Sequence, residues 1–215
     1  MANESPEPAT SLNDDVADAL LAAAIEIVDQ SGVAALTNRR LAEAAGTTTM
    51  AIYTRFGGKE GVANALFDYG FEVLGTSLAT LSPTDDASEN LVALCNRYRH
   101  FGLERPGLYS IMFERAIDLE SGFSSAPAGR TFDALVNRVA AVTGRDAISP
   151  VSRSEAFGVW ALCHGLVNLE LNGTGAPQQS DTKAALFTDA ISVHVAGLAT
   201  RLMGTQDDEQ EASNE

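Results

Sequence analysis

The stretch from Thr37 to Lys59 restricts the fold more than any other part of the chain. Thr37 is a suitable N-cap for a short helix over Asn38–Ala45, because its hydroxyl can accept a hydrogen bond from an unpaired N–H group of the first turn. Gly46 follows directly, and a glycine just past a helix end can adopt a positive φ and redirect the chain. The pattern therefore predicts a short helix that ends in a sharp turn.

A second helix is predicted immediately after that turn. Thr48 is its N-cap and residues 49–56 form it, which places Ile52 and Phe56 four residues apart on one face. Small and hydroxyl side chains are left on the other faces. Two short helices joined by so tight a turn are typical of a helix-turn-helix, whose second helix enters the major groove of DNA.

The residues of this stretch also follow a family pattern. They are Thr37, Arg39, Leu41-Ala42, Ala45-Gly46-Thr47-Thr48, Ile52-Tyr53, Phe56 and Lys59. Their order and spacing resemble the N-terminal pattern of the TetR family of bacterial transcriptional regulators, which runs Thr, Arg, Ile/Leu-Ala, Ala-Gly-Val-Ser, Leu-Tyr, Phe and Lys. The resemblance implies an all-α protein with an N-terminal three-helix DNA-binding domain and a larger C-terminal helical domain for ligand binding and dimerisation.

Helical periodicity and capping signals extend over the rest of the chain, and no strand pattern or repeat occurs. Further helices are predicted over residues 14–30, from 59 to just before Pro83, and over 87–104, 107–116, 130–142, 150–171 and 182–203, with a loop over 117–128. We expect a disordered tail over 1–13, a helix-turn-helix domain over 14–60, a ligand-binding and dimerisation domain over 61–203, and an acidic disordered tail over 204–215.

The net charge of −15 is unfavourable for DNA binding until its distribution is considered. Seven acidic residues lie in the two predicted tails, which leaves −8 on the body between them. The stretch from Thr37 to Glu60 carries four basic and two acidic side chains, so a local positive patch is predicted. No apolar run approaches the length of a membrane span, and the N-terminus does not resemble a signal peptide, so we expect a cytoplasmic protein without a membrane partner.

The side chains outside the Ile52 and Phe56 face predict the contacts to double-stranded DNA. Arg39 can reach a guanine edge, the short or apolar residues at the start of the second helix suit thymine methyl groups, and Tyr53 and Lys59 can reach phosphate oxygens. The predicted DNA-binding residues are Asn38, Arg39, Thr48, Thr49, Met50, Ala51, Tyr53, Thr54, Arg55 and Lys59. A dimer would read a near-palindromic operator.

A stripe of small and apolar residues on the helix over 150–171 suggests close approach of another helix, because glycine in a helix interior is otherwise unfavourable by up to about 1 kcal/mol. TetR-like subunits dimerise through such a four-helix interface. The predicted dimer residues are Gly158, Leu162, Gly165, Leu169, Leu186, Ile191, Val195 and Leu198. Packing of this stripe within one subunit is the alternative.

Large apolar residues on the later helices predict a cavity for a small-molecule effector with a hydrophobic body and one or two hydrogen-bonding groups. The predicted lining is Phe67, Phe71, Leu74, Tyr98, Phe101, Tyr109, Met112, Phe113, Phe132, Trp160, His164 and Asn168. Residues 160–165 resemble the Trp-x-x-x-His-Gly signature of one TetR subgroup. His164 either orients a ligand or bonds a backbone carbonyl, and close packing of all these side chains is the alternative to a cavity.

No motif for nucleotide, metal or covalent catalysis occurs, so neither an enzyme nor a cofactor nor a metal is predicted. Cys95 and Cys163 are predicted to be small core residues. The sequence thus favours a homodimeric repressor released from its operator by an apolar ligand. Two alternatives remain, a ligand-independent or activating regulator and an all-helical carrier or enzyme with a vestigial helix-turn-helix.

Overall fold

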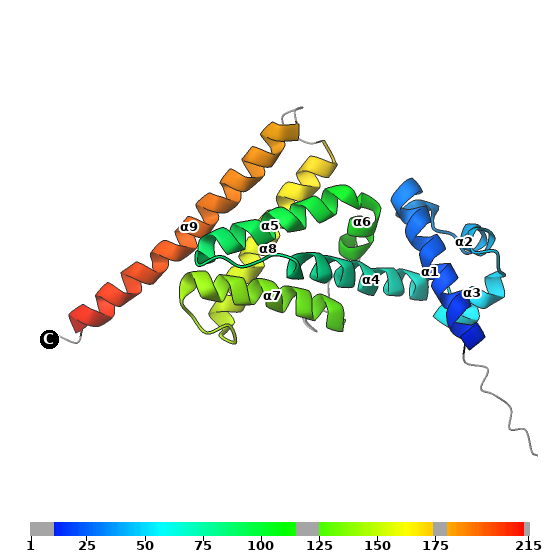
Figure 1. Ribbon diagram of the computed structural model, residues 1–215, viewed down its shortest axis with the longest axis horizontal. Coiled ribbons are helices and arrows are strands. Elements are labelled where there is room, and N and C mark those ends of the chain that lie inside the picture. The colour runs from blue at the N-terminus through cyan, green and yellow to red at the C-terminus, as the bar shows by residue number, and fades with distance from the viewer. Residues whose placement is uncertain (1–10, 115–124, 174–179, 213–215) are drawn as a thin grey trace, which may run out of the picture. The chain divides into compact units, whose positions relative to one another are not determined.

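The structure of the protein is a computed structural model that describes residues 11–114, 125–173 and 180–212 (Figure 1). Within these ranges the chain is helical and contains no strand, so the predicted all-α fold is confirmed. None of the helices described there has the length and apolar composition needed to cross a membrane. The elements are α1 (Ser11–Ser31), the 3-10 helix η1 (Val33–Ala35), α2 (Asn38–Ala44), α3 (Thr49–Phe56), α4 (Lys59–Ala79), α5 (Ala87–Glu104), α6 (Pro106–Glu114), α7 (Ala126–Thr143), α8 (Pro150–Leu171) and α9 (Ser180–Ala212).

The helices form two compact units that share α4. The first contains α1, η1, α2, α3, α6 and the part of α4 up to Gly70, and the second contains the rest of α4 with α5, α7, α8 and α9. The predicted division after residue 60 lies ten residues earlier, at the start of α4. Helix α6 belongs to the first unit although it follows α5 in the chain, because it packs against α1.

A small apolar core joins the helices of the first unit. From α1 it takes Leu20 and Ile27, and from α2 and α3 it takes Leu41 and Ile52, all of which are buried. Leu36, in the connection before α2, is buried against them as well. Helices α2 and α3 each have few apolar residues, so their packing on the longer α1 supplies most of their stability.

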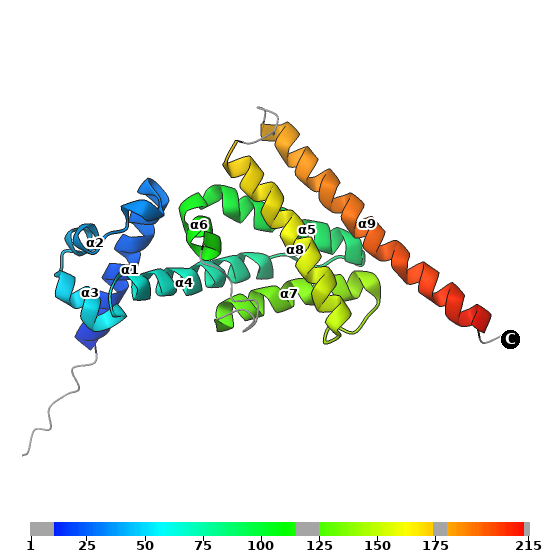
Figure 2. The ribbon, with the colours of Figure 1, turned by 180° about the vertical axis from the view of Figure 1, so that it is seen from behind.

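The second unit is a bundle in which α5, α7, α8 and α9 pack against one another, and α8 crosses α5 and α7 (Figure 2). A bidentate ion pair lies within it. Arg99 of α5 donates from Nε and Nη2 to the two carboxylate oxygens of Glu170 on α8, at 2.8 and 2.7 Å. The same guanidinium lies 5.8 Å from the ring centre of Phe187 on α9, so this α5 side chain contacts two further helices and links three.

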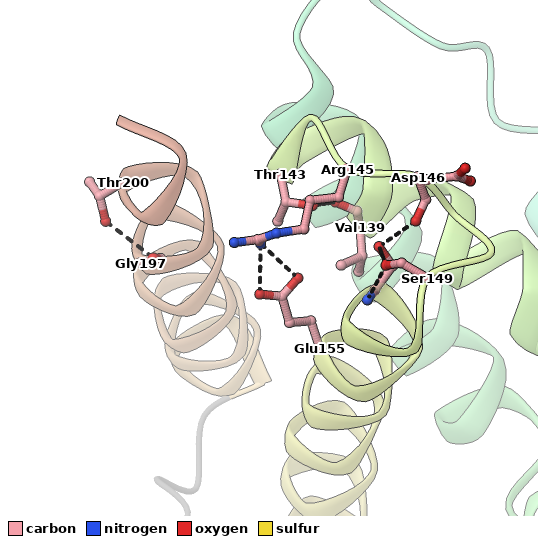
Figure 3. A network of polar contacts seen from close by, with 9 residues as sticks. Val139, Thr143, Arg145, Asp146, Ser149, Glu155, Gly197 and Thr200 are labelled. Atoms are coloured by element: carbon pink, nitrogen blue, oxygen red, sulfur yellow. Dashed lines mark hydrogen bonds and ion pairs between the residues drawn. The ribbon is translucent and has the colours of Figure 1, made fainter. Parts of the chain in front are cut away.

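Side-chain hydrogen bonds hold the connection between α7 and α8 (Figure 3). Arg145 donates from Nη1 to Oε1 of Glu155 at 2.9 Å, which ties the connection to the second turn of α8. Ser149 caps α8 by accepting from the backbone N–H of Ser152 at 3.0 Å, and the Ser152 hydroxyl donates to the Asp146 carbonyl at 2.8 Å. The connection therefore has a defined conformation.

Several helix ends differ from the prediction. Helix α7 begins at Ala126, inside the predicted loop, because Ser125 caps it with a hydrogen bond of 3.4 Å from the Ala128 N–H and a proline lies in its first turn. Helix α9 continues to Ala212 instead of ending at Met203, so its backbone takes in most of the range predicted as a disordered acidic tail. One glycine at position 204 is too weak a signal to end a helix when the residues beyond it favour helix. The predicted tail residues 1–10 and 213–215 lie outside the described ranges.

Candidate nucleic-acid interface and effector region

Capping contacts set the geometry of α2 and α3. The Thr37 hydroxyl accepts from the backbone N–H of Arg40 at 3.2 Å, and the Thr48 hydroxyl accepts from that of Ala51 at 3.3 Å. Between them Gly46 has a φ of 63°, a value that side-chain-bearing residues rarely adopt. The predicted caps and turn are thus present, and the angle between the two helices is determined by local contacts.

Helix α3 has one buried face and one open face. Ile52 is completely buried beneath it, whereas Met50 is 69% exposed and Tyr53 is 55% exposed. Thr49 and Thr54 are exposed as well. The Thr54 hydroxyl donates to the Met50 carbonyl at 2.9 Å, so toward a partner it can act only as an acceptor, beside its methyl group. The open face of α3 offers one thioether, one phenol and two threonines.

The basic residues around these helices are not equivalent. Arg39 and Lys59 are exposed at the first turns of α2 and α4. Arg40 donates from Nη2 to the Ser31 hydroxyl at 2.8 Å, which ties α2 to the end of α1. Arg55 is half-buried. Arg39 also lines a hollow of about 620 Å³ beside α2, together with Ala35, Thr37, Arg40, Glu43 and Ala44.

Asn38 is placed differently from its predicted DNA-binding neighbours. It is half-buried, and its Nδ2 donates to the Tyr53 hydroxyl at 3.1 Å, across from α2 to α3. Ala51 is half-buried too, and the Thr48 hydroxyl is occupied by its capping bond. Seven of the ten predicted residues are exposed, namely Arg39, Thr48, Thr49, Met50, Tyr53, Thr54 and Lys59.

Four predicted effector residues form a hydrogen-bonded cluster in the second unit. Trp160 donates from Nε1 to the Tyr98 hydroxyl at 3.3 Å, and that hydroxyl lies 3.4 Å from Nδ1 of His164. The Asn168 amide nitrogen lies 2.9 Å from Nε2 of the same imidazole. Burial lowers the pKa of His164 below its ordinary value, so the imidazole is favoured in its neutral form. The ring therefore contacts side chains on both nitrogens.

The remaining predicted effector residues divide between the units. Phe71, Leu74, Phe101 and Phe132 are buried in the second unit. Phe67 of α4 and the α6 residues Tyr109, Met112 and Phe113 lie in the first unit, where the rings of Tyr109 and Phe113 are 4.7 Å apart. Tyr109, one of the four predicted polar groups, is thus in a different unit from Tyr98, His164 and Asn168.

A groove of about 490 Å³ lies between α4 and α7 in the second unit. Of the predicted effector residues, Phe71 lines it. The residues that the sequence did not indicate are Glu72, Gly75, Thr76, Ala79, Pro127, Arg130, Thr131 and Ala134. Their signal was hidden because residues 126–128, in the first turn of α7, were predicted to be loop, so the spacing of Pro127, Arg130 and Thr131 along one helix face was not apparent. No group of three or more His, Cys, Asp or Glu side chains that could hold a metal occurs within the described ranges.

The predicted dimer residues of α8 are exposed or half-buried, whereas most of those on α9 are buried. No described atom outside the local backbone lies within 4 Å of a Cβ built on Gly158 or Gly165, and Leu169 is 48% exposed. Leu162 is half-buried. On α9, Leu186 is 51% exposed, but Ile191, Val195 and Leu198 are buried inside the subunit. These three residues pack within one subunit, which is the alternative to the predicted dimer contact. The open side of α9 carries Val193, which is 75% exposed.

Sequence comparison matches two family models to separate parts of the chain. Residues 20–66 match the model for bacterial regulatory proteins of the tetR family. Residues 91–194 match the model for the tetracyclin repressor-like C-terminal domain. No curated protein matches the sequence. The first match contains α2 and α3 completely, and the second contains the cluster around His164.

Solved structures share the fold over most of the chain. A protein with unknown function from Rhodococcus sp. RHA1 is 27% identical, with a TM-score of 0.67 over 91% of this chain and 100% of the other. BioQ from Mycobacterium smegmatis is 24% identical, with a TM-score of 0.61 over 86% of this chain and 98% of its own. TetR-Q116A from Acinetobacter baumannii AYE, solved in complex with minocycline, is 21% identical, with a TM-score of 0.63 over 83% and 93% of the two chains.

Proposed function

The chain belongs to the TetR family of transcriptional regulators, and on that premise we propose that it is a homodimeric repressor that leaves its operator when a small molecule binds to the second unit. The observation that carries the DNA-binding part is the arrangement of α3, which buries Ile52 and exposes Met50 and Tyr53. Threonine caps at the starts of α2 and α3 hold this arrangement. Because its target is chromosomal DNA, we place the protein in the bacterial cytoplasm.

The proposed DNA contacts divide into positioning and specificity. Tyr53 and Lys59 bind phosphate oxygens, which fixes the position of the protein on the duplex without reading sequence. Arg39, exposed at the start of α2, binds a guanine edge, and Met50 with Thr49 contacts thymine methyl groups. Two copies related by a twofold axis then bind half-sites whose centres lie about 34–36 Å apart, or a multiple of that spacing.

The proposed dimer forms through the open apolar faces of α8 and α9. Phe157, Leu169, Leu186 and Val193 are large apolar side chains exposed on these two helices. The glycines of α8, at which a built Cβ meets no neighbour, allow a partner helix to approach closely. Two copies of each helix make a four-helix interface, with Ile191 and its buried neighbours on α9 supporting it from within each subunit.

The proposed effector site lies around Tyr98, Trp160, His164 and Asn168. This cluster combines two aromatic surfaces with several polar atoms on α5 and α8, which suits a ligand with an apolar body and one or two hydrogen-bonding groups. The minocycline complex of the Acinetobacter protein supports a small-molecule effector for this fold. Helix α4 begins in the first unit at Lys59 and ends in the second, so a shift of its C-terminal half changes the placement of the DNA-binding helices.

Genomic binding-site selection with the purified protein tests the DNA-binding part, and two variants then test the contacts. Arg39→Ala should weaken operator binding by about 1 to 3 kcal/mol, because the contact to one base pair is lost. Lys59→Ala should weaken binding to all DNA sequences alike. It should also lower the salt slope, which is the slope of the logarithm of the binding constant against that of the salt concentration, by about one unit. An unchanged salt slope in Lys59→Ala would remove the phosphate assignment. Selection that enriches no sequence would contradict the function as a whole.

Titration of a panel of apolar metabolites tests the release mechanism. Trp160 reports binding by its fluorescence, because its ring lies 5.8 Å from that of His164 within the proposed site. A ligand that changes this fluorescence should also lower operator affinity. If both signals stay constant over the whole panel, a ligand-independent or activating regulator becomes the better description.

A further inference from the structure

Tyr53 is the most exposed aromatic side chain of α3, yet contacts on two sides restrict it. On one side Asn38 donates from Nδ2 to the phenol oxygen at 3.1 Å. On the other side lies Gly58, where a Cβ would be only 3.2 Å from Cε1 of the Tyr53 ring. The φ of Gly58 is 115°, which residues with a side chain rarely adopt, and any Cβ at this position would crowd the ring. An exposed tyrosine normally samples several rotamers, and these contacts restrict it.

We propose that Asn38 is a positioning residue for DNA binding, which directs the hydroxyl hydrogen of Tyr53 toward a phosphate oxygen. The proposal rests on the DNA-binding function proposed above for α3, and it replaces the expected direct contact between Asn38 and DNA. Asn38 is half-buried behind Tyr53, and its amide nitrogen is already engaged.

The direction of the hydrogen bond carries the argument. A phenol has one hydrogen to donate and an oxygen that accepts, whereas a phosphate oxygen can only accept. If Tyr53 donated to the amide oxygen of Asn38, no hydrogen would remain for DNA. Because Nδ2 donates to Tyr53 instead, the phenol oxygen is occupied as an acceptor and its hydrogen is free to point outward. A hydroxyl that accepts one bond is also a better donor of the next.

The amide oxygen of Asn38 supports a functional reason for this orientation. Among the residues that the structure describes, this Oδ1 is the buried side-chain atom that has no hydrogen-bond partner. Unsatisfied buried polar atoms are destabilising and uncommon, so a role beyond stability is expected where one is retained. A leucine at position 38 has nearly the same shape and no such oxygen. The change to leucine should therefore weaken DNA binding without lowering stability.

A double-mutant cycle on a mixed-sequence DNA duplex at low salt tests the proposal, since a phosphate contact needs no operator. Tyr53→Phe should weaken binding about tenfold, the effect of losing one hydrogen bond to a charged group. Asn38→Leu should weaken it several-fold when Tyr53 is present and have no effect when Phe is present. Its thermal midpoint should be equal to or above that of the wild type. Asn38→Ala is a second variant at the same position, so that a folding defect in one of the two variants does not decide the result.

Three outcomes would overturn the proposal. If Asn38→Leu weakens binding equally with Tyr or Phe at position 53, Asn38 acts independently of the phenol. If it lowers the thermal midpoint and affinity together, its role is structural. If Tyr53→Phe binds like the wild type while Lys59→Ala still lowers the salt slope, the phenol makes no phosphate contact although the DNA-binding function stands. A wild-type protein that binds no duplex at low salt would instead contradict the proposed function itself.

Discussion

The α2–α3 pair and the α8–α9 pair expose opposite kinds of side chain. Around α2 and α3 the open residues are mainly hydroxyl, basic and phenolic groups over a small apolar core, with Glu43 as an acidic exception and Met50 as the one large apolar exception among the described side chains. On α8 and α9 the open faces carry Phe157, Leu169, Leu186 and Val193. A polar, cationic surface suits a polyanion, whereas a large exposed apolar face suits another protein surface.

The two pairs also differ in what determines their geometry. Helices α2 and α3 are short, and threonine caps with one positive-φ glycine set the turn between them. Helices α8 and α9 are long, and distant contacts such as the Arg99–Glu170 pair determine which of their faces is open. A change in the first pair should therefore act locally, and a change in the second should act on association or on the whole bundle.

The largest effect is expected from a charge on the α8 face. Gly165→Glu places an uncompensated carboxylate from each subunit in the proposed interface, which should weaken the dimer by about 3 to 5 kcal/mol. Sedimentation equilibrium should then show monomers, with operator affinity lost in parallel. Ile148→Glu is the matched control, because Ile148 is exposed in the connection before α8. A Gly165→Glu protein that stays dimeric would place the interface elsewhere.

Replacement of a buried α9 residue should act on folding instead. Ile191 is completely buried, so Ile191→Ala should lower the free energy of unfolding by about 2 to 5 kcal/mol. Leu186→Ala, on the open side of the same helix, should mainly alter the dependence of the unfolding midpoint on protein concentration. Denaturant titrations at several protein concentrations separate the two effects. Equal behaviour of the two variants would argue against two distinct faces of α9.

A smaller and local effect is expected from the cap of α3. Thr48→Ala removes the acceptor for the Ala51 N–H and should destabilise the first unit by about 1 kcal/mol. Hydrogen exchange should speed up in α3 and leave the amides of α8 unchanged. Thr48→Ser retains the hydroxyl and is the control. Faster exchange throughout both units would show that the cap matters beyond the helix-turn-helix.

The smallest effect is a pH dependence from His164. Burial lowers the pKa of His164 in the folded protein below the ordinary value of 6.5. As the pH falls, the unfolded chain therefore binds more protons than the folded protein does. This contribution to stability is fully present above about pH 6.5 and decreases as the pH falls through the folded pKa. His164→Gln should flatten the dependence of the free energy of unfolding on pH over that range. His100→Gln, at an exposed site, is the control variant. A profile identical to the wild type would exclude His164 as its cause.

The sequence predicted the helix bounds well where local signals determine them. The ranges 49–56, 87–104 and 150–171 agree with α3, α5 and α8, because a cap or a proline marks where each of these helices starts or stops. The predicted start of α7 was wrong because the cap and proline signals of Ser125 and Pro127 were not recognised. The end of α9 was wrong because Gly204 was given too much weight.

Contacts between distant residues were harder to predict. The spacing of Ile191, Val195 and Leu198 correctly indicates a covered face of α9, but periodicity does not tell whether the subunit itself or a partner covers it. Trp160, His164 and Asn168 repeat every four residues and were expected to converge. Their link to Tyr98 spans more than 60 positions along the chain, and only the packing of α5 against α8 brings it about.

The ion pair between Arg99 and Glu170 has a consequence for the speed of any response. The side chains of Arg99 and Glu170 are 13% and 12% exposed, respectively. A molecule that moves α8 away from α5 must therefore leave two charges briefly unpaired and poorly hydrated. That intermediate raises the barrier in both directions without changing the difference between the end states. An effector that enters by this route should bind slowly and dissociate slowly, so that the cell would sense a sustained concentration and ignore a brief pulse.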